Sequence, residues 1–440
     1  MNKFLIRIAA AAIAILTMTS GCDCKHGPDE IGYDKVMILY SAGHNSISSY
    51  LRQDIADMKK GFVPSKGSEE VILIMSHQPN YDGKYSPTSP VLINLYKDKK
   101  KKVVMDTVAV FSQETIPTKA SDFNYILSKI YKQFPAKHYG MVFSSHASGW
   151  MPKGYYENPE SYDNQQKSPD NKKAAFSAHP QFKLPEGAVP YYETELPEGS
   201  IPVKSIGSTV MTESGNITVK YELDIDELSS NLPMHLDYML LDACLAGGIE
   251  TAYQLKDKCD IICFSSAEVL AEGFNYSTLA THLLEHNGDV GAVAKDYFEQ
   301  HAAETDPVKQ SATVSVVDCK RIEGIATVCS NLFDKYRASI ETVDTDKVQP
   351  YFRGNRHWFY DLEDILVESG ISNEEKRQLE TALDECIIYK AATEYFMRGQ
   401  SGFKIDTFSG FSMYLPCNGS AYLDDFYRTL EWNKATKLVD

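Results

Sequence analysis

The sequence predicts an α/β protein with a mostly parallel central sheet. Two observations carry this prediction: short segments that are apolar throughout, and intervening segments whose apolar residues recur at helical spacing. A segment without alternation of apolar and polar residues indicates a strand buried on both faces, as in a parallel sheet. Strands are predicted at 35–40, 71–75, 139–146, 239–244, 261–266, 313–317 and 411–415.

Helices are predicted between these strands. Leu51, Ile55 and Met58 recur at the spacing of one helix face. Ser372 and Glu375 have the spacing of a capping box, which predicts a long helix to about residue 393. A β-hairpin is expected at 91–111, with a lysine-rich tip. Further helices are predicted at 121–134 with Ser121 as N-cap, 224–231, 248–256, 277–286, 290–303 and 424–432.

The composition narrows the class of protein. The chain has 440 residues, with 44 Lys and Arg against 60 Asp and Glu, so its formal charge is −16. A chain this acidic gives no electrostatic support for nucleic-acid binding. Neither a GxGxxG nor a GxxxxGK[ST] segment is present, so no motif predicts a nucleotide site.

The N-terminus resembles a bacterial lipoprotein signal. Lys3 and Arg7 precede a short apolar stretch, and small residues at 19–21 lead to Cys22. The stretch is too short to span a bilayer as a helix. We expect residues 1–21 to be removed and Cys22 to be acylated, so that residues 22–33 tether the protein to the bacterial cell envelope. The alternative is an ordinary cleaved signal peptide.

Two of the predicted strands deliver a reactive side chain at their carboxyl end. The apolar run at 139–146 ends in His146, and the run at 239–244 ends in Cys244. Open α/β sheets bind their ligands at this end of parallel strands. A thiol beside an imidazole is the minimal nucleophile and base of a cysteine hydrolase. His44, which also follows a predicted strand, is a rival for the imidazole role.

The sequence predicts a reactive thiol at Cys244. A helix that begins directly after this residue would place the thiol at the positive end of a helix dipole, and a nearby imidazole would lower the thiol pKa further. The backbone N–H groups of Cys244 and Ala147 would stabilise an oxyanion. His146 would protonate the leaving amine. No third residue that orients the imidazole is evident, so we expect a dyad.

Five segments, in order along the chain, resemble the clostripain (peptidase C11) family. The segment 146–150, His-Ala-Ser-Gly-Trp, resembles the family's H-G-S-G-W block, and 241–244, Leu-Asp-Ala-Cys, resembles its D-A-C nucleophile block. Further similarity lies at 39–45, 265–276 and 409–416. The resemblance implies a caspase-like three-layer α/β/α sandwich with a mostly parallel central sheet and a C-terminal extension. It also implies a cysteine endopeptidase with a His–Cys dyad.

The resemblance assigns roles to individual residues. Cys244 would be the nucleophile and His146 the general acid/base, while Asp242 with Glu268 or Glu272 would line the pocket for the residue before the scissile bond. Carboxylates in that pocket would select Arg or Lys through charge-assisted hydrogen bonds. The substrates would be proteins or peptides. No cofactor or metal is required, and calcium is suggested by the family alone, because no EF-hand loop is present.

The same resemblance and the proline-rich segment predict the domain organisation. A catalytic domain is expected at 34–305, interrupted by a proline-rich segment at 151–205 that shows no helical or strand period. Residues 306–440 are expected to complete the sheet or pack on it. Some family members cleave themselves between the His and Cys blocks. Lys172 and Lys173 precede small residues in the proline-rich segment, so cleavage after either is a hypothesis, with an uncut surface loop as the alternative.

Two departures from the family pattern leave other functions open. Ala147 stands where the family has Gly, and the spacer between His146 and Cys244 is long. One alternative is a non-catalytic binding lipoprotein of the cell envelope that has kept the fold. Another is a transpeptidase, which uses the same dyad and passes the acyl group to an amine.

Overall fold

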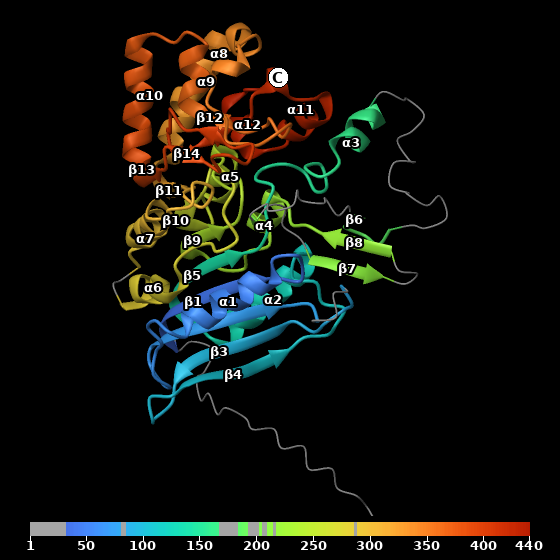
Figure 1. The fold of residues 1–440 in the computed structure, drawn as a ribbon, viewed down its shortest axis with the longest axis vertical. Coiled ribbons are helices and arrows are strands. Elements are labelled where there is room, and N and C mark those ends of the chain that lie inside the picture. Colours follow the sequence, from blue (N-terminus) through green and yellow to red (C-terminus); the bar gives the residue numbers. More distant parts are fainter. Residues whose placement is uncertain are drawn as a thin grey trace, which may run out of the picture.

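The computed structural model in Figure 1 describes residues 32–80, 85–166, 184–191, 202–204, 209–213, 217–285 and 288–440. The predicted signal, Cys22 and most of the predicted tether lie outside these ranges, as do Lys172 and Lys173. No helix within the described ranges is both long enough and apolar enough to cross a membrane.

A nine-stranded sheet forms the centre of the molecule, in the order β13-β11-β10-β9-β5-β1-β2-β3-β4. Its five middle strands run parallel, which confirms the predicted α/β class with a parallel centre. They are β1 (Tyr33–Ala42), β2 (Glu70–His77), β5 (Ala136–Ser144), β9 (Leu236–Asp242) and β10 (Cys259–Phe264). Antiparallel strands close the two edges: β3 (Val91–Lys97), β4 (Val103–Val110), β11 (Thr313–Asp318) and β13 (Ile387–Ala392).

Helices flank this sheet and bury their apolar faces against it or against one another (Figure 1). The N-terminal two thirds of the chain contain α1 (Ser48–Met58), α2 (Ala120–Gln133), α3 (Pro159–Gln166), α4 (Ile225–Ser230), α5 (Ile249–Leu255), α6 (Tyr276–Ala280) with a π-helical turn at Thr281–Glu285, and α7 (Val290–Ala302). The remainder contains α8 (Ile322–Ile340), α9 (Leu362–Glu368), α10 (Asn373–Cys386), α11 (Ala421–Tyr427) and α12 (Glu431–Thr436).

A small sheet stands beside the main one and contains part of the proline-rich segment. Its order is β6-β8-β7, with β6 (Ala188–Pro190), β7 (Thr209–Glu213) and β8 (Ile217–Tyr221). Helix α3 and strand β6 both lie within 151–205, so the described part of that segment has structure that its lack of periodicity did not predict. The remaining short strands pair as β12 (Tyr360–Asp361) with β16 (Ser412–Met413), and as β14 (Tyr395–Phe396) with β15 (Phe403–Lys404).

Several predicted elements differ from those observed. The long helix predicted to about residue 393 ends at Cys386, because the β-branched and aromatic residues that follow pair with β11 as the edge strand β13. Helix α2 begins at Ala120, so Ser121 is not its N-cap. The strand predicted at 411–415 is reduced to β16 and pairs with β12 outside the main sheet. The 19-residue helix α8 was not predicted.

The C-terminal region shares one hydrophobic core with the rest of the chain. A buried carboxylate marks the junction: Glu250, at the start of α5, accepts hydrogen bonds from the Tyr414 N–H (2.8 Å) and the Tyr427 hydroxyl (2.8 Å). The indole of Trp150 packs against the rings of the same two tyrosines at 4.8 and 5.1 Å. Residues 306–440 therefore pack on the sheet and also extend it through β11 and β13.

Candidate active site

The parallel strands β5 and β9 bring His146 and Cys244 to the same edge of the sheet. Ser144 and Asp242 are register partners at the ends of these strands, and His146 and Cys244 each follow two residues later. Both side chains are buried, with 6% of His146 and none of Cys244 exposed. The two residues therefore follow equivalent strand ends, as the sequence predicts.

The loops that follow the two strands fit closely against each other. Gly149 has a φ of +62°, and a Cβ added there would lie 2.5 Å from the carbonyl oxygen of Leu245. Leu245 itself has a φ of +58°, which is unusual for a residue with a branched side chain. The residue directly after Cys244 is therefore held in a strained conformation by its surroundings. Trp150 is wholly buried in the junction with the C-terminal region.

A short piece of the proline-rich segment, residues 202–204, lies across this site as an extended strand. Val203 forms an antiparallel bridge with Leu270. The N–H of Lys204 donates to the carbonyl of Val269 (2.8 Å), and the N–H of Ala271 donates to the carbonyl of Pro202 (3.0 Å). The N–H of Cys244 donates to the carbonyl oxygen of Lys204 at 3.3 Å. The Lys204 peptide is thus held directly over the predicted nucleophile.

The Lys204 side chain points into a closed pocket of acidic and hydroxyl groups. It is completely buried, and its ammonium contacts the carboxylate of Asp242, Asp54 Oδ2 at 3.4 Å and Ser144 Oγ at 3.2 Å. The Tyr276 hydroxyl also donates to Asp242, at 2.6 Å. Burial alone would lower the pKa of Lys204, but Asp242 and Asp54 reverse this effect and raise it. The pocket therefore holds a charged lysine.

The thiol and the imidazole do not hydrogen-bond each other in this state. Cys244 Sγ accepts the N–H of Val269 at 3.0 Å, and His146 Nε2 lies 3.5 Å from Ser46 Oγ. Burial, followed by the nearby Glu268 carboxylate, raises the pKa of the Cys244 thiol well above its usual value. Burial lowers the pKa of His146 to about 3. Both groups are therefore neutral at physiological pH while residues 202–204 are in place.

The predicted lowering of the thiol pKa is wrong for this state. The helix expected directly after Cys244 begins only at Ile249, with Gly248 as its N-cap, so the thiol does not lie in its first turn. The effect of a helix dipole falls off within that first turn. Burial dominates instead and raises the pKa of the Cys244 thiol.

The structure places the two predicted pocket glutamates differently. Glu268 is 5% exposed and close enough to influence the pKa of Cys244, but Arg353 binds it through two nitrogens, with Nη2 at 3.0 Å. Glu272 forms an ion pair with Lys309 at 3.6 Å, and 38% of its side chain is exposed. Neither glutamate contacts the ammonium of Lys204. Among the predicted carboxylates, Asp242 alone does so.

Asp54 contacts the buried ammonium and was not among the predicted site residues. It lies on α1 and is 5% exposed, on the same face as Leu51, Ile55 and Met58. A carboxylate at helical spacing within an apolar face was the available signal, because such a group is rarely buried without a partner. His44, the rival imidazole, has a structural role: Nδ1 lies 2.6 Å from the carbonyl of Val210, which links the first loop to β7.

A second buried lysine supports the loop after His146. Lys220 on β8 forms ion pairs with Glu157 (2.8 Å) and Glu222 (2.6 Å), and Glu222 also accepts the N–H of Gly154 (2.5 Å). This cluster fastens the loop at 154–157 to the small sheet. The sequence analysis did not predict it, since the three charged residues lie in segments without periodicity.

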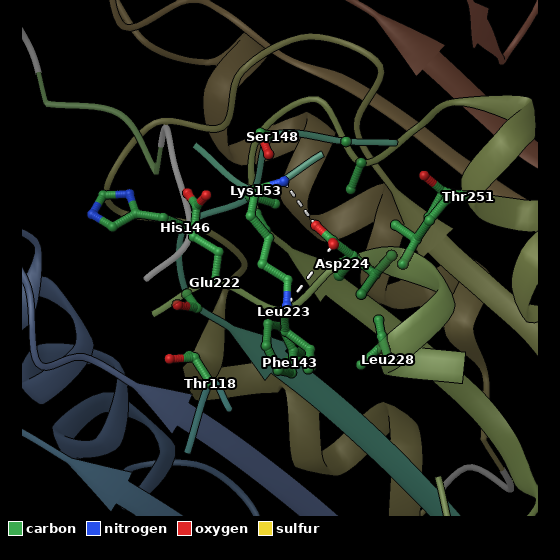
Figure 2. A pocket seen from close by; sticks show the side chains of 17 residues that line it. Thr118, Phe143, His146, Ser148, Lys153, Glu222, Leu223, Asp224, Leu228 and Thr251 are labelled. Carbon is green, nitrogen blue, oxygen red and sulfur yellow. Dashed lines mark hydrogen bonds and ion pairs between the residues drawn. The ribbon is translucent and has the colours of Figure 1, made fainter. Parts of the chain in front are cut away.

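A small cavity of about 50 Å³ adjoins His146 and Ala147, and neither Lys204 nor Asp242 lines it. Figure 2 shows Lys153 reaching toward Asp224 within it, while the imidazole of His146 points away from both. The cavity is therefore distinct from the pocket that Lys204 fills. In the described part of the chain, no group of three or more His, Cys, Asp or Glu side chains is placed to hold a metal ion. The seven cysteines of that part are free thiols, and Cys417 is exposed.

Comparison with known families identifies the family of this chain. The sequence model of the clostripain family matches residues 39–169 and 216–439. The chain belongs to the clostripain family. It is therefore a cysteine endopeptidase, and the alternative of a non-catalytic binding protein is set aside. The matched ranges leave out residues 170–215, which include Lys204.

Solved structures show that the clostripain fold extends over nearly the whole chain. An inactive zymogen of a C11 protease from Parabacteroides distasonis superposes with a TM-score of 0.69 at 22% identity, over 92% of this chain and 98% of that one. A secreted C11 cysteine protease from Bacteroides thetaiotaomicron, in complex with an irreversible peptide inhibitor, gives 0.68 at 19%, over 92% and 99%. These likenesses confirm the caspase-like fold. No curated protein matches this clostripain-family chain at a significant level.

The burial of Cys244 predicts the order in which thiols react in the uncut peptidase. In a His146→Ala chain, we expect iodoacetamide to modify the exposed Cys417 before Cys244, because access and thiolate character control thiol reactivity. Adding Lys204→Ala should speed the modification of Cys244 by at least about tenfold. Mass spectrometry of tryptic peptides reports both rates, and Lys100→Ala, at an exposed lysine, is the control. Equal labelling of Cys244 with and without Lys204 would contradict this account.

Proposed function

We propose that this peptidase uses Cys244 and His146 to cleave peptide bonds after basic residues held by Asp242. We further propose that it is made as a precursor that cleaves its own chain after Lys204. One observation carries both statements: a lysine fills a carboxylate pocket while its carbonyl oxygen accepts the N–H of Cys244. This is the arrangement expected of a substrate residue on the amino side of a scissile bond.

The contacts of residues 202–204 support this assignment. An extended peptide that adds to a strand edge gains main-chain hydrogen bonds, and pockets for its side chains provide specificity. Here the bridge with Leu270 supplies the main-chain bonds, and the Asp242 pocket receives the basic side chain. The N–H that binds the ground-state carbonyl is also placed to stabilise the oxyanion that forms during attack.

The chemical steps follow from these positions. The thiol of Cys244 gives its proton to His146, and the sulfur attacks the carbonyl carbon of Lys204 to form a tetrahedral intermediate. The C–N bond to Ser205 then breaks, and His146 returns the proton to the leaving amine. A water molecule hydrolyses the resulting thioester with His146 as the base, which restores the free thiol and leaves Lys204 with a carboxylate.

The precursor is inhibited by the same contacts. Lys204 fills the basic pocket and covers Cys244, so no other peptide can enter while the segment remains seated. In this buried state the neutral imidazole and neutral thiol are favoured, which makes the first proton transfer unfavourable. Cleavage after Lys204 frees the new carboxyl end to leave the pocket, which then becomes available to other peptides.

The two products of this cleavage should stay together. Strands β1 to β6 lie before Lys204 and β7 to β16 after it, so the β5–β9 pair of the main sheet and the β6–β8 pair of the small sheet both join the halves. The shared core would also have to be exposed for the halves to separate, at a large hydrophobic cost. The mature form is therefore a complex of two chains.

The site of self-cleavage is testable by intact mass and N-terminal sequencing of purified chains. We expect the wild type to show a new N-terminus at Ser205 and Cys244→Ala to remain uncut. Lys204→Ala should slow cleavage by at least about a hundredfold, because the carboxylates of the pocket would be left without a cation.

The competing hypothesis of cleavage after Lys172 or Lys173 makes a different prediction for the same samples. It requires new N-termini at Lys173 or Ala174 and loss of cleavage in a Lys172→Ala/Lys173→Ala chain. That chain is the matched control here, since we expect it to be cut after Lys204 as the wild type is. Uncut wild type would reject self-processing altogether.

We propose that Cys22 carries the lipid that anchors the peptidase to the cell envelope. The support is the order of charged, apolar and small residues before this cysteine. The wild type expressed in a bacterial host should partition into detergent with Triton X-114, and Cys22→Ser should remain in the aqueous phase. Aqueous partitioning of both proteins would reject the anchor and favour an ordinary signal peptide.

A further inference from the structure

The pocket that receives Lys204 has a second carboxylate, and that carboxylate comes from a separate part of the fold. Asp242 ends β9, whereas Asp54 projects from α1, 188 residues earlier in the chain. Asp54 is almost fully buried, and its contact with the pocket is the ion pair between its Oδ2 and Lys204 Nζ at 3.4 Å. A buried carboxylate on an apolar helix face is costly unless it is paired. Its position is explained if a cation enters the pocket.

We infer that Asp54 makes this pocket selective for lysine over arginine. This inference rests on the proposed cleavage after basic residues and adds the identity of the preferred residue and the group that selects it.

The geometry around the ammonium favours lysine over arginine. Three oxygens surround Lys204 Nζ, one each from Asp242, Asp54 and Ser144. An ammonium group has three N–H bonds that diverge from one nitrogen, so each can be directed at one of these oxygens. A guanidinium is planar and prefers two parallel hydrogen bonds to one carboxylate. The oxygens here come from three different elements, α1, β5 and β9, and converge on a single point.

The far end of the pocket is closed, which disfavours arginine. Gly273, with a φ of +62°, lies so near that a Cβ there would be 2.4 Å from Lys204 Nζ. The terminal nitrogens of an arginine extend beyond the position of a lysine ammonium, so a guanidinium would have to displace this wall or Asp54. Two-point binding to Asp242 would also use Oδ2, which already accepts hydrogen bonds from Ser144 (3.1 Å) and Tyr276 (2.6 Å).

The charge of Asp54 depends on the cation in the pocket. Burial raises the pKa of Asp54, and Lys204 opposes this rise. Asp54 is therefore ionised most readily when an ammonium lies beside it. A side chain that holds its charge away from Asp54 would gain less from the second carboxylate than lysine does.

The inference is tested by self-cleavage in four chains that combine Lys204 or Lys204→Arg with Asp54 or Asp54→Asn. We expect Lys204→Arg to slow the first-order cleavage by at least about tenfold in the presence of Asp54. In Asp54→Asn chains, the rate with lysine should fall and the difference between lysine and arginine should shrink to about threefold or less. Asp57→Asn, on the same helix and paired with Lys60, removes the same charge outside the pocket and should leave the ratio unchanged.

A second measurement does not depend on the folding of any variant. The self-cleaved wild type should hydrolyse peptides with lysine before the scissile bond at least about tenfold faster, in kcat/KM, than matched arginine peptides. Equal rates for the two peptides would overturn the role of Asp54 while leaving the proposed peptidase intact. An Asp54→Asn chain that slows lysine and arginine cleavage to the same extent would do the same. Cleavage of neither peptide, with no self-cleavage, would overturn the proposed function and this inference together.

Discussion

The buried ion pair between Lys204 and Asp242 is the interaction on which the rest of the site depends. Both side chains are completely inaccessible, and a charge buried without its partner would cost several kcal/mol by general estimates. The pair exists because the backbone of residues 202–204 is held by strand pairing with 269–271, which fixes where the ammonium must go. The same seating covers Cys244 and keeps the thiol and His146 neutral. In the proposed function, recognition, inhibition and the position of the scissile bond are three consequences of this one set of contacts.

The sheet topology explains how distant segments reach this point. Parallel strands β5 and β9 deliver His146, Ser144, Asp242 and Cys244 to one edge. Helix α1 contributes Asp54, which contacts the ammonium of Lys204. The C-terminal region contributes Arg353, which forms an ion pair with Glu268. Because Arg353 neutralises Glu268, the acidic character of the pocket is confined to the two aspartates around the ammonium. We propose a function for the proline-rich segment in this arrangement, since residues 202–204 are the part that the pocket holds.

Much of this could be predicted from local sequence, and the rest could not for identifiable reasons. Apolar runs located the parallel strands and therefore His146 and Cys244, because strand patterns and strand-end chemistry are local signals, whereas Asp242 was assigned by the family resemblance. The Glu268–Arg353 pair joins residues 85 positions apart, so no local pattern contains it. Lys204 lies in a segment without periodicity, and nothing local distinguishes it from the chain's other lysines. Its role becomes visible only when the structure pairs it with Asp242. Asp54 was accessible in principle as a carboxylate on an apolar helix face.

The concentration dependence of self-cleavage tests most directly whether Lys204 occupies the pocket of its own chain. If Lys204 already occupies the pocket of its own chain, cleavage is an intramolecular reaction. Its half-time should then stay constant over roughly a hundredfold range of protein concentration. The precursor can be purified under reversible thiol blockage, released by a reductant, and followed by intact mass. A half-time that shortens in proportion to concentration would mean that one molecule cuts another, which would contradict the central place given to the buried Lys204–Asp242 pair.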